Sequence, residues 1–225
     1  MPVRLLILDE FPSEALDIIN SNKKFLTDIY IRPSSDFISK IIPNYNALLI
    51  KSSNKINKSV LQYATRCKFI GEAGVGLDNI DLEYASEKGI YVVNTPDAST
   101  ITVVELAFGL IISLARKIPF AHNSVNLNLW DRVTYEGFEL SGKTIGIIGF
   151  GRIGSRVGKL AKAFNMNVIA CDPYIDHSKY DKYNVTFHNH EYIYQNSDII
   201  SVHVPLTEET KDMITIKELS LMKSN

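Results

Sequence analysis

The sequence predicts an α/β protein in which two parallel sheets are covered by helices. Two observations support this fold class. Short apolar runs alternate along the chain with segments of helical periodicity, as strand–helix–strand units require. A cluster of breaker residues at positions 94–97, Asn-Thr-Pro-Asp, interrupts this alternation. We therefore expect two domains, residues 1–97 and residues 98–225, joined near that cluster.

The first 97 residues alternate strands and helices as a flavodoxin-like domain does. Ser13 is expected to cap the first helix, Pro43 to stop the second, and Gly89 to end the last. The predicted strands are residues 4–8, 28–31, 47–50, 69–70 and 91–93. The predicted helices are residues 13–20, 36–42, 57–64 and 81–88.

Residues 98–225 begin with a long apolar helix and continue as a second alternating unit. The predicted helices are 101–116, 120–129 and 219–223, and the predicted strands are 144–148, 167–171, 185–187 and 198–203. Residues 130–140 form a loop rich in aromatic and charged residues. Residues 179–184 and the stretch around His188 and His190 are expected to be surface loops. These two imidazoles lack the further ligands of a metal site, so we expect none.

The most informative stretch is the predicted strand 144–148 with the glycines that follow it. Gly149, Gly151 and Gly154 have the spacing G-x-G-x-x-G, and Asp172 ends the next strand about twenty residues later. These glycines allow a tight turn, close approach of a pyrophosphate and close packing of helix on strand, while the acid accepts hydrogen bonds from a ribose. The alternative is a purely structural turn. The order of strand, glycines, helix, strand and acid favours a Rossmann-type NAD-binding domain, and Asp172 favours NAD over NADP.

Composition excludes several other classes of protein. The net charge of −1 gives no reason to expect nucleic acid as a partner. No apolar run reaches the roughly 18 residues of a membrane span, and the N-terminal segment lacks the cleavage site of a signal peptide. Cys67 and Cys171 are isolated, which indicates a reducing compartment. We expect a cytoplasmic protein that acts on a small molecule.

Four separated stretches of the chain resemble signatures of the D-isomer-specific 2-hydroxyacid dehydrogenase family. They are Gly71–Asp81, Asn94–Leu106, Glu139–Gly154 and His203–Thr210. The resemblance implies NAD-dependent oxidation at the CH–OH group of a D-2-hydroxy acid. The first candidate is oxidation of 3-phosphoglycerate to 3-phosphohydroxypyruvate, the first step of serine biosynthesis. Dehydrogenases of glycerate, hydroxypyruvate, formate or another D-2-hydroxy acid, and a non-catalytic NAD-sensing protein, are the alternatives.

The same resemblance implies which residues bind cofactor and substrate. It assigns the cofactor to Val75, Gly149, Gly151, Arg152, Ile153, Gly154, Asp172, His203, Val204, Pro205 and Thr210. It assigns the substrate to Lys51, Ser52, Gly74, Val75 and Gly76. The glycines on either side of Val75 permit a backbone anion nest for the substrate carboxylate.

Two basic or acidic positions depart from what the resemblance implies for a phosphorylated substrate. Lys51 stands where an arginine often meets the phosphate, and it serves either that role or that of an ordinary surface lysine. Glu72 stands where the signature commonly has an arginine. We expect that Glu72 points away from the substrate or that the preferred substrate differs.

The family's catalytic arginine, glutamate and histidine have no counterpart among the 225 residues. We therefore expect no catalytic residue within this sequence, and an NAD-binding domain that is incomplete at residue 225. The apolar helix and Trp130 together indicate a homodimer built around residues 101–132.

Overall fold

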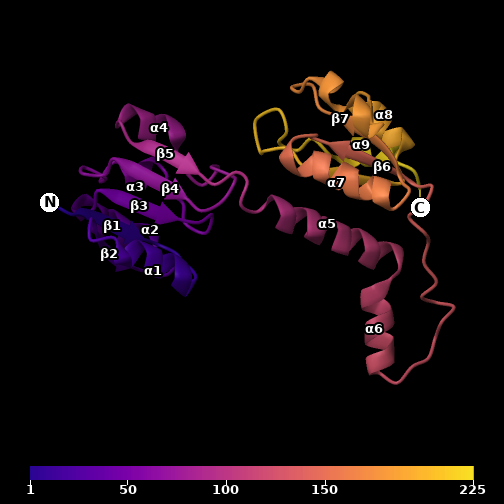
Figure 1. Cartoon of the computed structure of the whole chain (residues 1–225), viewed down its shortest axis with the longest axis horizontal. Helices are drawn as coiled ribbons and strands as arrows, with labels where there is room; N and C mark the ends of the chain where they lie inside the picture. Colours follow the sequence, from indigo (N-terminus) through magenta and orange to yellow (C-terminus); the bar gives the residue numbers. More distant parts are fainter. Residues whose placement is uncertain (225) are drawn as a thin grey trace. The chain divides into compact units, whose positions relative to one another are not determined.

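The chain folds as two compact units, unit 1 (Met1–Ser99) and unit 2 (Thr100–Asn225), each described by itself. The computed structural model describes the backbone of residues 1–224 and, apart from residues 181–183, their side chains. Each unit is a parallel sheet with helices packed on it, so the predicted α/β fold class is confirmed (Figure 1). In the described residues, no helix is both long and apolar enough to cross a membrane.

The described part of unit 1 contains a five-stranded parallel sheet with the strand order β2-β1-β3-β4-β5. Its strands are β1 (Val3–Ile7), β2 (Phe25–Ile29), β3 (Ala47–Ile50), β4 (Phe69–Glu72) and β5 (Tyr91–Asn94). Its helices are α1 (Ser13–Ser21), α2 (Ser35–Ile41), the 3-10 helix η1 (Ile42–Asn44), α3 (Lys58–Leu61) and α4 (Leu82–Glu87).

Side chains of β1 and β3 alternate between two apolar layers because successive residues of a strand point to opposite faces. Leu6 and Leu48 are buried with residues of α2, α3 and α4 on one face. Leu5, Ile7 and Ala47 pack with residues of α1 on the other. Helices therefore cover both faces, which explains why these strands are continuous apolar runs in the sequence.

Three local predictions for unit 1 were wrong in detail. Ser13 does not cap α1: the N-cap is Pro12, and the Ser13 hydroxyl instead donates to Glu14. The second strand lies at Phe25–Ile29, because pairing with β1 decides its register, and not at 28–31. The third helix has a single turn, Lys58–Leu61, capped by Asn57. The Gly89 prediction is confirmed, since Gly89 adopts the left-handed φ of 65° just after α4.

Unit 2 contains, in its described part, a four-stranded parallel sheet in the order β8-β7-β6-β9. The strands are β6 (Thr144–Ile148), β7 (Asn167–Cys171), β8 (Thr186–Phe187) and β9 (Ile199–Val202). The helices are α5 (Thr100–Ala115), α6 (Ile118–Asn126), α7 (Arg152–Ala163), the 3-10 helix η2 (His177–Tyr183), α8 (His190–Asn196) and α9 (Ile216–Leu221).

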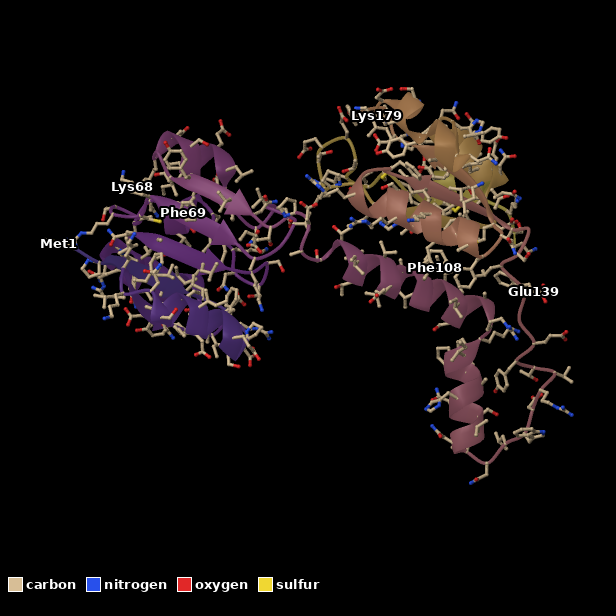
Figure 2. The ribbon with its side chains drawn as sticks, in the orientation of Figure 1. Met1, Lys68, Phe69, Phe108, Glu139 and Lys179 are labelled. Atoms are coloured by element: carbon tan, nitrogen blue, oxygen red, sulfur yellow. The ribbon has the colours of Figure 1, made fainter. Side chains whose placement is uncertain are left out.

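The two faces of the unit 2 sheet are covered by different helices. Ile145 and Ile147 pack with α5 and α7, where Phe108 of α5 (labelled in Figure 2) is buried. The Phe108 ring stacks on that of Phe164, with 5.4 Å between ring centroids. Ile148 and Ile169 pack on the opposite face with residues of α8 and α9. The alternation along β6 thus positions α7, the helix that follows the glycine turn, directly against the sheet.

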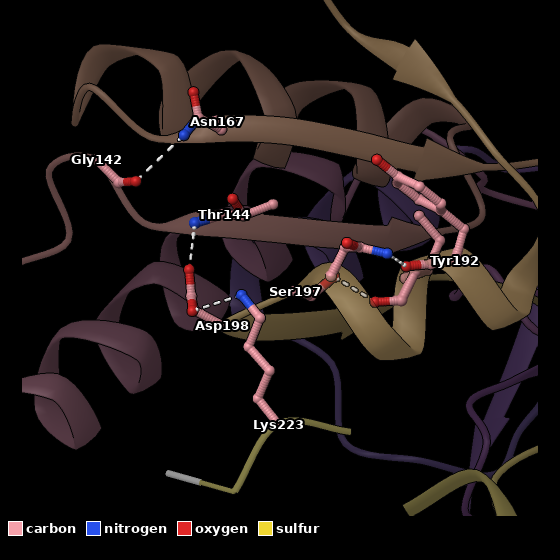
Figure 3. A network of polar contacts seen from close by, with 9 residues as sticks. Gly142, Thr144, Asn167, Tyr192, Ser197, Asp198 and Lys223 are labelled. Atoms are coloured by element: carbon pink, nitrogen blue, oxygen red, sulfur yellow. Dashed lines mark hydrogen bonds and ion pairs between the residues drawn. The ribbon is translucent and has the colours of Figure 1, made fainter. Parts of the chain in front are cut away.

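Asp198 fastens the amino ends of β6 and β9 to each other. Its carboxylate accepts hydrogen bonds from the Thr144 backbone N–H at 2.7 Å and from the Lys223 ammonium at 2.9 Å (Figure 3). Partial burial raises the pKa of Asp198, but the hydrogen bonds from Thr144 and Lys223 outweigh it, so the pKa lies below its usual value. This one side chain therefore holds the start of β6 and the segment after α9 beside the start of β9.

Two predicted surface loops of unit 2 are ordered structure. Residues 177–183 form η2, and Tyr180 packs edge-on against Phe150 at 5.2 Å because the buried Phe150 ring needs an apolar cover. The residues around His190 begin α8, which Asn189 caps by accepting from the Tyr192 N–H. The sequence analysis missed this helix because its histidines and tyrosines obscure the apolar periodicity.

Gly146, in the middle of β6, allows close packing of α8 on the sheet. A Cβ there would lie 2.1 Å from Ser197 Oγ and 2.6 Å from Ile193 Cγ2. We predict that Gly146→Ala destabilises the chain by about 1–3 kcal/mol through overpacking, as measured by urea unfolding. Gly109→Ala in α5, where nothing lies within 4 Å of the added methyl, is the control and should be neutral or stabilising. Equal stability of both variants would contradict this account of β6.

Candidate functional site

The turn between β6 and α7 is shaped by three glycines. Gly149 has a φ of 85°, and a Cβ there would lie 2.6 Å from the His203 carbonyl oxygen. A Cβ at Gly154 would lie 2.1 Å from the Gly149 carbonyl oxygen. Gly151 differs, because nothing lies within 4 Å of its missing side chain. Gly149 and Gly154 are therefore required by the fold, whereas Gly151 leaves the backbone open to a ligand.

The helix that follows this turn begins without a side-chain cap. Gly151 is the N-cap of α7 and has no side chain to accept from the first turn. Arg152 and Ile153 form that first turn, with Ile153 half-buried against the core. An uncapped helix N-terminus beside an open glycine fits a phosphate group.

Asp172 lies immediately after β7 and reaches across to this turn. Its Oδ2 accepts from the Phe150 N–H at 2.8 Å and its Oδ1 from the Tyr174 N–H at 3.0 Å. The side chain is half-buried, and a carboxylate has about four acceptor positions, of which these hydrogen bonds use two. Asp172 thus holds the glycine turn in place and still has lone pairs for ribose hydroxyls.

The segment after β9 packs beside the same turn. The His203 N–H donates to the Ile148 carbonyl at 2.7 Å, and its ring contacts Ser201 Oγ at 2.8 Å. Burial lowers the pKa of His203, which favours the neutral imidazole at pH 7. Val204 lies against Gly149, with its Cγ1 2.8 Å from where a Cβ would be.

The predicted cofactor residues further along this segment have an internal structural role. Thr210 Oγ1 donates to the Pro205 carbonyl at 2.5 Å and accepts from the Thr207 N–H at 2.8 Å. These bonds close a compact loop over residues 205–210. Thr210 therefore shapes the loop, and its hydroxyl is already used by the protein itself.

In unit 1, the segment from Ala73 to Asn79 follows β4 and contains the residues predicted to bind substrate, so it is called the substrate loop below. Neither Gly74 nor Gly76 has a positive φ, so the loop does not form a nest with a left-handed residue. Within the described residues, no acceptor is found for the backbone N–H groups of Gly74, Val75 and Gly76. Their carbonyl side is tied down, since Gly74 and Val75 accept from Thr95 and Asn94. The loop therefore leaves three backbone N–H donors available to a ligand, although none of its glycines adopts the left-handed conformation.

Beneath the substrate loop is a buried network of polar side chains. The Asn79 amide donates to Glu72 Oε2 and to the Asn54 carbonyl, both at 3.1 Å. The Asn54 amide in turn donates to Asp9 Oδ2 at 2.7 Å. Asp9, Asn54, Glu72 and Asn79 are all buried. The network joins the carboxyl ends of β1, β3 and β4.

This network fixes the direction in which the Glu72 side chain points. This side chain is 2% exposed and is hydrogen-bonded to Asn79, so it points into the unit and away from solvent. Sequence analysis did not identify Asp9, Asn54 or Asn79 as part of the site. The only sequence signal for Asp9 was its place directly after a buried strand.

Lys51 and Ser52 follow β3 at the same edge of the sheet. The Lys51 ammonium donates to the Glu10 carbonyl at 2.5 Å and lies 4.7 Å from the centre of the Phe11 ring. Lys51 and Arg32 both line a surface hollow of about 370 Å³. Ser52 is exposed. Lys51 thus shares this hollow with a second cation, Arg32, which was not predicted from the sequence, and with Asp9 and Glu10.

Other candidate chemistries find little support in the described residues. No group of three or more histidine, cysteine, aspartate or glutamate side chains there could hold a metal ion. Cys67 and Cys171 are buried free thiols, and burial raises the pKa of each. His188 and His190 lie against Tyr192 and Tyr194 in stacked arrangements.

Comparison with known proteins identifies the family. A model of the NAD-binding domain of D-isomer specific 2-hydroxyacid dehydrogenases matches residues 108–225. A hydroxypyruvate reductase of Thermotoga maritima is 39% identical over 220 residues, which are 98% of this chain and 71% of that protein. This chain therefore belongs to the D-isomer specific 2-hydroxyacid dehydrogenase family, and unit 2 carries its NAD-binding domain.

Two further proteins are similar to nearly the whole chain. A D-3-phosphoglycerate dehydrogenase of Methanocaldococcus jannaschii is 40% identical over 224 residues, 99% of this chain and 42% of that protein. The chain thus spans about two fifths of the length of this curated relative. A structure of D-lactate dehydrogenase from Aquifex aeolicus, complexed with NAD and lactic acid, has a TM-score of 0.85 at 30% identity, covering 98% of this chain and 66% of that one.

Asn79 is the centre of the network beneath the substrate loop. We predict that Asn79→Ala destabilises the chain by about 1–3 kcal/mol in urea unfolding, because it removes the donor to the Glu72 carboxylate and to the Asn54 carbonyl. Asn20→Ala, at an exposed position in α1, is the control and should change stability little. If the two variants unfolded at the same urea concentration, the network would not stabilise unit 1.

Proposed function

We propose that this chain functions in an NAD-dependent oxidoreductase that acts on the CH–OH group of a D-2-hydroxy acid. The first candidate substrate is 3-phosphoglycerate. The observation that carries the proposal is the backbone of the substrate loop. Three successive N–H groups, at residues 74–76, have no acceptor among the described residues. Backbone donors at the carboxyl end of a parallel sheet are suited to a carboxylate ligand.

In unit 2, the residues fit the NAD that the family implies. The open backbone at Gly151 admits a pyrophosphate, and the uncapped start of α7 contributes its positive dipole end. Asp172 accepts from the ribose, and its charge repels a 2′-phosphate. The Val204 side chain and the His203 backbone pack against Gly149 and so support the glycine turn that would hold the cofactor. When bound, NAD accepts the hydride, and the protein's part is to bind and orient.

In unit 1, the substrate loop is assigned to the carboxylate of the substrate. Lys51, with Arg32 in the same hollow, is assigned to the phosphate of 3-phosphoglycerate. Lysine acts there as a point charge, without the two-pronged geometry of arginine. Residues 1–97 are thus the substrate domain and residues 98–225 the NAD-binding domain.

The relatives support this substrate and one alternative. Four relatives at 36–40% identity are named D-3-phosphoglycerate dehydrogenase. A hydroxypyruvate reductase is similar at 39% identity over a larger share of its own length. The alternative is therefore an enzyme that interconverts glycerate and hydroxypyruvate. The free thiols Cys67 and Cys171 support a cytoplasmic location, where thiols stay reduced.

A substrate panel tests the proposal. The protein encoded by the gene that carries this sequence is assayed for NADH formation with 3-phosphoglycerate, D-glycerate and D-lactate. The expected outcome is turnover with NAD, highest for 3-phosphoglycerate, and highest for D-glycerate if the alternative holds. NAD binding without turnover of any of these acids would favour an NAD-sensing protein instead.

Selectivity for NAD is predicted to rest on Asp172. Asp172→Ala should weaken NAD binding to the chain by about 1–3 kcal/mol, the range for a lost charged hydrogen bond, and narrow the difference from NADP. Titrations followed by calorimetry measure both affinities, with circular dichroism to verify folding because Asp172 also holds Phe150. Asp17→Ala, at an exposed position of α1, should bind as the unmutated chain does. Equal NAD and NADP affinity before mutation would refute the role of Asp172.

We further propose that the chain forms a homodimer built around the apolar side chains of residues 101–132. Leu106, Leu110 and Leu114 are 62–73% exposed and lie one turn apart on α5, so they form one stripe. Exposed apolar residues continue along α6 and the segment after it, at Phe120, Val125, Leu127, Trp130 and Val133. An exposed apolar surface of this extent is typical of an interface.

A charge placed on this stripe should separate the dimer. We predict that Leu110→Glu shifts the chain from dimer to monomer at micromolar concentration, as measured by light scattering, because burying an unpaired carboxylate is costly. Ile18→Glu adds the same charge at a 73% exposed position of α1 and should leave the dimer intact. A monomer before mutation, or dissociation by both variants alike, would reject the interface.

A further inference from the structure

Glu72 is a buried acid that has no cationic partner among the described residues. It is 2% exposed at the end of β4, and its one hydrogen-bond donor among the described residues is the neutral Asn79 amide, at 3.1 Å. Asn79 Oδ1 is itself buried without a donor. Burying an ionised carboxylate without a countercharge is costly in free energy, so burial favours the protonated form of such a group.

The carboxylate lies directly beneath the substrate loop. A Cβ added at Gly74 would come within 2.9 Å of Glu72 Oε1, so the absence of a side chain at Gly74 is what lets the acid and the loop approach. Asn79, at the other end of the loop, is held by Glu72 and by the Asn54 carbonyl. Glu72 therefore lies against Gly74 near the start of the substrate loop and against Asn79 at its end.

The charged groups around Glu72 further favour its protonated form. Burial is the main cause that raises the pKa of Glu72, and Asp9, from the end of β1, and Asp78, within the loop, raise it further by repulsion. The Asn79 hydrogen bond acts in the opposite direction. At the end of β3, the Lys51 ammonium is directed to the Glu10 carbonyl, and on the α4 side Asp81 accepts from the Tyr84 N–H.

We propose that Glu72 is a positioning residue whose carboxylate takes up a proton when the Gly74–Gly76 segment binds a carboxylate ligand. The inference rests on the proposed function of the loop and adds its regulation by pH. A bound anion places a third negative charge, beyond Asp9 and Asp78, close to Glu72. The neutral acid relieves that repulsion, so binding of the anion shifts the Glu72 carboxylate toward its protonated form, with uptake of a fraction of a solvent proton per anion bound. By linkage, protonation of Glu72 strengthens anion binding to the same degree.

The test follows NMR signals of the 225-residue chain as D-glycerate is added. Amide signals of Gly74, Val75 and Gly76 report binding, and the Glu72 side-chain carbonyl carbon reports its own titration. Between about pH 5 and about pH 8 the ligand stays ionised. The affinity is expected to fall roughly tenfold across this range in the unmutated chain, and ligand should raise the pKa of Glu72. Glu72→Gln should bind with little pH dependence, while Glu87→Gln, exposed on α4, should behave as the unmutated chain.

A stability measurement accompanies the binding test. Because the pKa of Glu72 is raised in the folded chain above its ordinary 4.5, its stabilising contribution is present below that value and is lost as pH rises through the folded pKa. The urea midpoint of Glu72→Gln relative to the unmutated chain should therefore be higher at about pH 8 than at about pH 4.

The outcomes separate this inference from the proposed function. D-Glycerate binding with the same pH dependence in the unmutated chain and in Glu72→Gln would overturn the proton coupling and leave the proposed function intact. A Glu72 carbon signal that does not respond to ligand would overturn it as well, even if the variant did not fold. No D-glycerate binding at any pH would reject both the coupling and the substrate role of the loop.

Discussion

In each unit, an aspartate just past the end of one parallel strand accepts a backbone N–H just past the end of its neighbour. Asp9 follows β1 and holds the Lys51 N–H after β3 at 2.8 Å. Asp172 follows β7 and holds the Phe150 N–H after β6 at 2.8 Å. Strand pairing stops at these points, so the backbone would otherwise lack a partner. The two carboxylates extend the order of the sheets into the loops that the proposed site uses.

These two hydrogen bonds explain why the loops of the proposed site can leave backbone groups accessible and still hold one conformation. Phe150 is fixed by Asp172, so the neighbouring Gly151 needs no packing of its own and leaves its backbone accessible. On the other side of the turn, Gly149 and Gly154 fit only because they lack side chains. In unit 1, a hydrogen bond from Asn54 to Asp9 and another from Asn79 to the Asn54 carbonyl connect Asp9 to the substrate loop.

Glu72 departs from the rule that buried charges are paired. A well-packed apolar side chain at its position would avoid the cost of burying a carboxylate. Its place beside the substrate loop gives that cost a proposed function, because a carboxyl group whose pKa is raised by burial responds to nearby charge. Departures from local stability rules are expected at functional sites.

The sequence by itself determined the central strands, the glycine turn and the family. Residues 47–50, 144–148 and 167–171 were predicted with the observed bounds, because strands buried on both faces are continuous apolar runs. The register of β2, the helix begun by His190 and the network joining Asp9, Asn54 and Asn79 were decided only by tertiary structure. Asp9 and Asn54 are 45 residues apart in the chain. No local pattern encodes such a contact, since it exists only once the parallel strands have aligned their carboxyl ends.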